Sequence, residues 1–166
     1  MKMKSMLVVI ALLMVTLATK AQTNSKLAFS IGGELAVATG NLNIPYSIGI
    51  GATAQLDYAT NENTAITFNS GIVELIGKKI KGTNTKFRSV AVIPFLGGVK
   101  YYFTTNLYGA AQLGASVFTQ NGTGAKFTYS PGLGFKVNDR VDALVKYTGY
   151  TDLGGTFGVR VAYTLQ

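Results

Sequence analysis

Residues 46–58 alternate between two kinds of side chain, and this alternation constrains the fold more than any other stretch of the sequence. The even positions from Ile48 to Leu56 are apolar, with Tyr46 and Tyr58 at the two ends, whereas the odd positions are small or polar. A period of two over this length predicts a long β-strand with one apolar and one polar face. Such a strand, tilted by roughly 40°, extends over about 30 Å and could cross the hydrocarbon layer of a bilayer.

The rest of the chain repeats this unit. The phase blurs after Gly71, where we expect a β-bulge, and Pro94 predicts a bulge or a local break, because proline cannot donate a hydrogen bond to a neighbouring strand. The predicted strands cover residues 27–39, 46–58, 64–77, 87–103, 107–119, 126–137, 141–150 and 155–165.

Short and longer connections alternate along the chain. Three-residue turns are predicted at 61–63, 104–106 and 138–140, and mostly longer connections at 40–45, 78–86, 120–125 and 151–154. The pattern predicts an all-β fold, an eight-stranded antiparallel up-and-down transmembrane β-barrel with its short turns on one rim. Aromatic residues are expected near both rims. They are Tyr58, Tyr101, Phe103, Phe135 and Tyr163 near the short turns, and Tyr46, Phe87, Phe127, Tyr129, Tyr147 and Phe157 near the longer loops.

The composition of the polar face indicates which side of the barrel faces outward. A soluble barrel would present many Lys, Glu and Asp side chains to water, but this face is mostly Gly, Ser, Thr and Ala, and charged residues make up only 13% of the chain. On a lipid-facing surface each charge would cost on the order of 2–4 kcal/mol near the midplane. We therefore expect the apolar face outside and a charge network in the lumen. Its predicted members are Glu34, Asp57, Arg88, Lys100, Lys136, Asp142, Lys146 and Arg160.

The first 21 residues have the pattern of a signal peptide. Lys2 and Lys4 precede an apolar run at 7–17, and Thr19 and Ala21 occupy the small-residue positions of a cleavage site. The apolar run is shorter than the roughly 20 residues that a spanning helix needs. We expect export, with residues 22–166 as the mature domain. The net charge of +8 falls to +5 without the three leader lysines, and nothing in it requires a nucleic-acid partner.

The residue types present argue against catalysis. The chain contains no histidine and no cysteine, which removes the commonest general base, the commonest metal ligand and any disulfide. No Ser-x-x-Lys motif occurs. The carboxylates of Glu34, Asp57 and Asp142 are better interpreted as members of luminal ion pairs than as a catalytic pair. The sequence therefore predicts neither an enzyme nor a site for a metal or cofactor.

Residues 27–166 resemble the small eight-stranded outer-membrane barrels of the OmpA-membrane-domain and OmpX type. One local motif supports the resemblance: Thr156, Gly158, Val161 and Tyr163 match the C-terminal assembly signal of such barrels, although three residues follow the aromatic here. The resemblance implies the outer membrane of a Gram-negative bacterium, contact with its lipid, recognition by the barrel assembly machinery and a monomeric protein. The Ala-Gln start after the leader resembles exported proteins of the Bacteroidota.

Two classes of function remain open. A structural or surface-interaction protein would display its loops outside, and the basic loop of Lys78, Lys79, Lys81 and Lys86 would either bind lipopolysaccharide phosphates or another anionic partner, or simply remain solvated. The alternative is a narrow channel or a small-ligand-binding barrel, including a soluble lipocalin-like periplasmic carrier with its faces inverted. A wide pore is not expected, because side chains fill the interior of an eight-stranded barrel.

Overall fold

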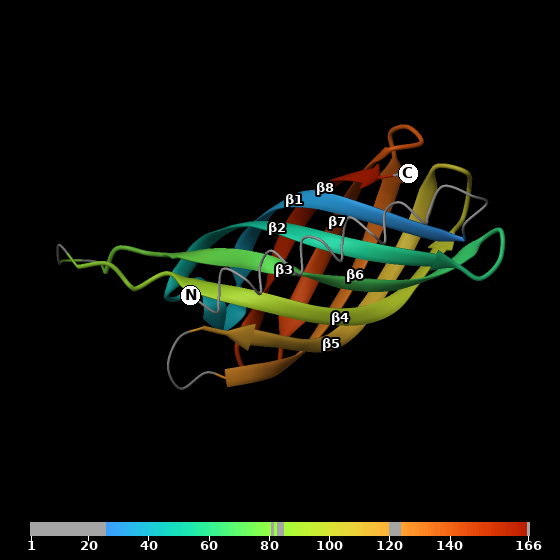
Figure 1. The fold of residues 1–166 in the computed structure, drawn as a ribbon. Coiled ribbons are helices and arrows are strands. Elements are labelled where there is room, and N and C mark those ends of the chain that lie inside the picture. The colour runs from blue at the N-terminus through green and yellow to red at the C-terminus, as the bar shows by residue number, and fades with distance from the viewer. Residues whose placement is uncertain (1–25, 81, 83–84, 120–123, 166) are drawn as a thin grey trace, which may run out of the picture.

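A computed structural model describes residues 26–80, 82, 85–119 and 124–165, so the predicted signal peptide and Lys81 lie outside the described residues. Eight strands pair in sequence order, each antiparallel to the next, and β8 pairs with β1 to close the barrel (Figure 1). No helix in the described part of the chain is long and apolar enough to cross a membrane. The elements are β1 (Leu27–Thr39), the short 3-10 helix η1 (Gly40–Asn43), β2 (Tyr46–Ala59), β3 (Thr64–Gly77), β4 (Val90–Tyr102), β5 (Leu107–Phe118), β6 (Gly124–Lys136), β7 (Val141–Tyr150) and β8 (Gly154–Leu165).

The two faces of the sheet are arranged as the composition predicts. Outward residues of the described strands are mainly apolar and exposed, with Leu35 at 60% and Leu113 at 61% of their surface. Inward residues include charged side chains that are almost fully buried, such as Arg160 at 1%. The inverted arrangement expected of a soluble carrier is therefore not found in these strands, and the closed antiparallel barrel is confirmed.

Polar side chains hold each of the three short turns. The Oδ1 atom of Asn61 accepts a hydrogen bond from the backbone N–H of Asn63, and Asn138 Oδ1 accepts from Arg140 and Val141. In the third turn, Thr104 Oγ1 accepts from the two residues that follow Thr105. Side chains of this kind stabilise turns by occupying backbone donors that the strands leave free. The local sequence thus determines the rim that we call the short-turn rim, formed by residues 60–63, 103–106 and 137–140.

The position of Tyr46 differs from the prediction. The register between β2 and β3 shifts between Tyr46 and Gly49, and a shift of one residue moves a side chain to the opposite face of the sheet. Tyr46 is consequently buried inside the barrel, with 8% of its surface exposed, instead of lying in the outer aromatic belt.

The bulge expected near Gly71 is absent. β3 keeps one phase along its whole length and pairs with β2 in unbroken register from Ala65 to Leu75. Val73 and Leu75 therefore point inward, although both are apolar, and Glu74 points outward and is exposed. The alternation of apolar and polar residues is irregular in this part of the sequence because the inward residues of β3 are apolar here, like the outward ones.

The fourth strand is shorter than predicted. β4 begins at Val90, so Phe87 and Arg88 lie before it in the connection from β3. Pro94 pairs in register with β5, but the pairing with β3 is interrupted between Phe95 and Val92. The predicted local break at Pro94 is thus confirmed, and it causes no change of register.

Gly134 makes room for a buried tyrosine, which leads to a testable prediction. A β-carbon at Gly134 would overlap the ring of Tyr108, which is 1% exposed. We expect Gly134→Ala to lower the free energy of unfolding by about 1–3 kcal/mol, because a tightly packed interior accommodates added atoms poorly. Urea unfolding of the refolded protein measures this. Gly97→Ala is the matched control, since a β-carbon at outward Gly97 would meet no atom within 4 Å; equal effects of the two variants would contradict the packing account.

Candidate functional site

The end of the lumen at the longer loops is filled by apolar side chains. In this cluster, which we call the apolar plug, the rings of Phe118 and Tyr150 meet edge to face with centroids 5.2 Å apart, and Leu153 packs against the cluster from the β7–β8 connection. The cluster brings apolar side chains from six of the eight strands and from η1 together at this end of the lumen. Its members are Ala38, Leu42, Tyr46, Val73, Leu75, Val90, Val92, Phe118 and Tyr150.

Between the apolar plug and the short-turn rim, the lumen is occupied by hydrogen-bonded polar side chains. Gln112 Nε2 donates to Thr67 Oγ1 at 2.9 Å and to Gln55 Oε1 at 3.3 Å, which links β5 to β3 and β2 across the interior. On the other side of the barrel, the hydroxyls of Ser130 and Thr148 lie 3.0 Å apart. Such contacts compensate the polar groups for their removal from water.

A buried ion pair joins the first strand to the seventh. Lys146 Nζ lies 2.9 Å from Glu34 Oε2, and only 5% and 6% of the two side chains are exposed. Removing two charges from water is expensive, and their mutual attraction offsets that cost only when the geometry is close. The sequence predicted both residues as luminal, and the structure brings them together.

Arg160 stabilises the junction between β8 and β1, where the barrel closes. Its Nε donates to Thr53 Oγ1 at 2.9 Å and its Nη2 to Ser30 Oγ at 3.1 Å. The side chain crosses Gly32, where a β-carbon would lie 2.9 Å from Nε. Among the described residues no carboxylate lies within ion-pair distance of Arg160, although Glu34 is its register partner on β1.

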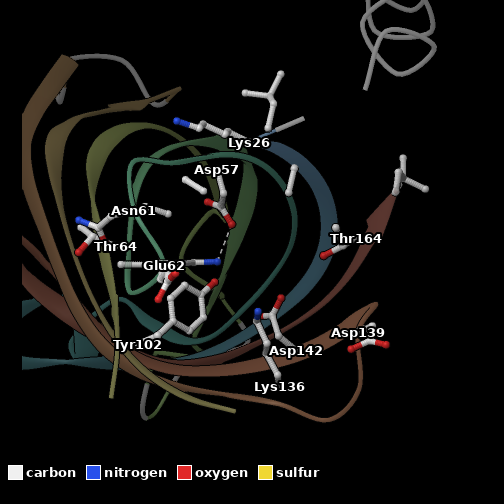
Figure 2. A pocket seen from close by; sticks show the side chains of 16 residues that line it. Lys26, Asp57, Asn61, Glu62, Thr64, Tyr102, Lys136, Asp139, Asp142 and Thr164 are labelled. Atoms are coloured by element: carbon white, nitrogen blue, oxygen red, sulfur yellow. Dashed lines mark hydrogen bonds and ion pairs between the residues drawn. The ribbon is translucent and has the colours of Figure 1, made fainter. Parts of the chain in front are cut away.

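The lumen opens at the short-turn rim into a pocket of about 780 Å³, which we call the vestibule (Figure 2). Lys100 Nζ lies 2.7 Å from Asp57 Oδ2, and the side chain of Gln55 donates to the other oxygen of Asp57 at 2.8 Å. In Figure 2, Asp57 lies on one side of the vestibule, and Lys136 and Asp142 lie on the opposite side.

Asp142 has a partner that the sequence did not reveal. The hydroxyl of Tyr108 donates to Asp142 Oδ1 at 2.6 Å. Tyr108 lies on β5 and reaches across β6 to β7, and this reach depends on the glycine at 134. Within the described chain, no group of three or more acidic residues is arranged to hold a metal ion.

Seven of the eight predicted luminal charges lie inside the barrel, and Arg88 is the exception. The prediction placed Arg88 on the inner face of a strand beginning at Phe87, but it lies before β4 and is exposed. It belongs instead to the extension of the β3–β4 hairpin, together with the basic loop.

The described residues of this extension, 78–80, 82 and 85–88, include Lys78, Lys79, Lys86 and Arg88, and we call this segment the basic hairpin. In Figure 1 it extends beyond the other loops of its rim. Its two sides pair through a bridge between Lys79 and Lys86 and a backbone hydrogen bond from Phe87 to Lys78. Lys78 Nζ donates to the backbone and side-chain oxygens of Asn43, each at 2.6 Å, which ties the base of the hairpin to η1. Lys79, Lys86 and Arg88 are all exposed.

Comparison with protein-family models and with curated proteins gave no match. Among solved structures, the chain is similar to a de novo designed transmembrane β-barrel at 16% identity and a TM-score of 0.55, covering 82% of this chain and 94% of that one. It is also similar to the Yersinia pestis outer membrane protein Ail in a phospholipid bilayer nanodisc, at 14% identity, 82% and 98% coverage and a TM-score of 0.58. Ail in complex with the heparin analogue sucrose octasulfate matches at 15% identity, 83% and 97% coverage and a TM-score of 0.52. At these low identities, the structural similarity shows a shared fold.

Proposed function

We propose that this chain is an outer-membrane barrel with a closed lumen, which binds phosphorylated or sulfated saccharides through its basic hairpin. The observation that carries the proposal is the position of three cations, Lys79, Lys86 and Arg88, on a hairpin that extends beyond the rim. Cations that are exposed together attract multivalent anions more strongly than isolated ones do. The role is binding rather than catalysis.

The outward face supports the membrane placement. Exposed apolar side chains cover the outer face of the described strands. Away from the strand ends, Glu74 is the one charged residue among the described outward positions. Aromatic residues such as Tyr101 and Phe135 are exposed near the short-turn rim, and Phe127 and Phe157 near the other. Apolar surface between two aromatic girdles is typical of barrels in the outer membrane.

The proposal includes the route to that membrane. The N-terminal segment would direct export, and Thr156, Gly158, Val161 and Tyr163 would be recognised by the assembly machinery of a Gram-negative cell. Thr156 and Gly158 face the lumen, whereas Val161 and Tyr163 are exposed on the outside. An outward pair of this kind is accessible to another protein before the barrel is surrounded by lipid.

Saccharide binding is also supported by a neighbour of the same fold. The Ail structure holds sucrose octasulfate, a compact polyanion. Lipopolysaccharide carries phosphate groups on its saccharides, so the same cations would suit either ligand. The basic hairpin offers ammonium groups, which bind such anions as point charges, and the guanidinium of Arg88, which can form bidentate hydrogen bonds.

The binding experiment uses the refolded protein with sucrose octasulfate and, separately, with purified lipopolysaccharide. The triple variant Lys79→Gln, Lys86→Gln and Arg88→Gln should bind sucrose octasulfate at least about tenfold more weakly at low salt, because three charge contacts of about 0.5 kcal/mol or more each are removed. Isothermal titration calorimetry gives the affinities. Affinity for the unmodified protein should also fall as salt is raised.

The matched control is a variant with the same kind of substitution elsewhere. Lys26→Gln and Lys136→Gln remove cations near the short-turn rim and should leave sucrose octasulfate binding unchanged. Equal weakening by the control would contradict a site on the basic hairpin. Binding of lipopolysaccharide but not sucrose octasulfate would restrict the ligand to membrane lipid.

A narrow channel is the second candidate, because the vestibule opens widely at one rim. The apolar plug argues against conduction, since it places Leu75 and Phe118 across the other end. We expect no single-channel current from the protein in planar bilayers. Replacement of both residues by serine should then allow ions to pass, and conduction by the unmodified protein would favour the channel.

A further inference from the structure

Two opposite charges in the vestibule lie next to each other on neighbouring strands without forming an ion pair. Lys136 and Asp142 are register partners on β6 and β7, and both point inward. Side chains directly opposite one another on antiparallel strands begin about 4.5–5.5 Å apart, so a lysine and an aspartate there can usually meet. Here the ion pairs formed by the described residues include neither of them.

Each of the two charges is instead held by a tyrosine. Lys136 Nζ lies 4.4 Å from the centroid of the Tyr102 ring, which stabilises the ammonium through the negative face of the ring. Asp142 Oδ1 accepts the hydrogen bond from Tyr108. No described residue donates to the second oxygen of Asp142. The tyrosines thus position an ammonium and a carboxylate side by side and leave each one able to bind a further group.

The other charges that line the inner part of the vestibule are already matched. Lys100 is paired with Asp57 at 2.7 Å, and its ammonium also lies 4.8 Å from the ring centroid of Tyr108. Lys26, Glu62 and Asp139 lie at the rim and are exposed. A ligand deep in the vestibule would therefore meet one available cation and one available anion.

We propose that the vestibule binds a small zwitterion of the amino-acid type. The carboxylate of the ligand pairs with Lys136, its ammonium group pairs with the second oxygen of Asp142, and the Tyr102 ring forms an apolar wall beside the side chain of the ligand. A simple anion would be attracted by Lys136 but repelled by Asp142. A simple cation would be attracted by Asp142 but repelled by Lys136. The vestibule volume of about 780 Å³ lies within the range of about 300–1,000 Å³ usual for small-molecule sites. This inference is independent of saccharide binding by the basic hairpin.

The experiment measures binding of four probes to the refolded, isotope-labelled protein by NMR titration at constant ionic strength. The probes are the dipeptide alanyl-alanine, free alanine, N-acetylalanine, which lacks the ammonium, and alanine amide, which lacks the carboxylate. We expect saturable shifts near Tyr102 and Asp142 with the two zwitterions. Each blocked compound should bind at least about tenfold more weakly, since it loses one of two charge contacts.

Two variants test the assigned residues. Lys136→Gln and Asp142→Asn should each weaken binding of the zwitterions at least about tenfold, and asparagine at 142 keeps an oxygen that can accept from Tyr108. Lys126→Gln is the matched control, because Lys126 lies on the same strand near the opposite rim and pairs with exposed Asp152. The shift in gel mobility between unboiled and boiled samples in SDS shows that each variant is folded.

The proposal is overturned by equal binding of blocked and unblocked probes, by the absence of saturable shifts at millimolar concentrations, or by binding that survives both vestibule variants. The two sites can be told apart directly. The triple variant of the basic hairpin should bind alanyl-alanine normally, and Asp142→Asn should bind sucrose octasulfate normally. Failure of one site therefore leaves the other testable.

Discussion

Replacing Leu113 by lysine is expected to lower the free energy of unfolding in lipid vesicles by about 2–4 kcal/mol. Leu113 lies in the middle of β5 on the outward face, where 61% of its surface is exposed. Its register partners, Gly97 and Tyr129, carry no charge that would pair with the new ammonium. In a bilayer the ammonium must enter hydrocarbon or draw water and polar groups toward itself, and both responses cost free energy.

Urea unfolding of the protein refolded into vesicles measures this effect. Thr105→Lys is the control, because it adds the same charge to an exposed short turn and should change the stability by no more than about 0.5 kcal/mol. A Leu113→Lys variant as stable as the unmodified protein would mean that the outward face does not contact lipid. The test therefore addresses the membrane placement without depending on any ligand.

Removing the lysine of the buried ion pair should have the second large effect. We expect Lys146→Met to lower the free energy of unfolding by about 3–5 kcal/mol, because Glu34 is left as a buried charge without its partner. Arg160, the register partner of Glu34, does not replace Lys146, since Ser30 and Thr53 hold its guanidinium elsewhere. Urea unfolding again provides the measurement.

A double variant separates the unpaired charge from a simple loss of packing. Lys146→Met combined with Glu34→Met should recover more than half of the lost stability, because apolar replacements of a buried ion pair are often neutral. Lys126→Met removes a lysine from the exposed pair with Asp152 and should cost less than about 1 kcal/mol. If Lys146→Met had no greater effect than Lys126→Met, the buried pair would contribute little to stability.

The sequence predicts the strands and their faces well where only one face is apolar. β1, β3 and β7 have the predicted bounds, and the alternation in β6 assigns Lys136 to the lumen correctly. Prediction fails where the interior itself is apolar. Val73 and Leu75 belong to the apolar plug, so both faces of β3 look alike in the sequence and suggest a bulge that does not exist.

Other features depend on contacts between distant residues, which alternation does not encode. The inward turn of Tyr46 follows from a register shift against β3, and the pattern of β2 alone gives no sign of it. Arg88 has the phase of an inward residue, but β4 starts only at Val90. The pairing of Asp142 with Tyr108 was also not predictable, because Tyr108 must cross Gly134 on the intervening strand to reach it.

The contacts of Arg160 affect the register in which the first and last strands pair. They join β8 to Ser30 on β1 and to Thr53 on β2, residues that lie 130 and 107 positions away in the sequence. If β8 paired with β1 one residue out of step, Arg160 would point into lipid and lose both hydroxyl partners. The same slip would turn the outward apolar residues of β8, such as Val159 and Val161, into the lumen. The contacts of Arg160 therefore add to the preference for one alignment of the first and last strands.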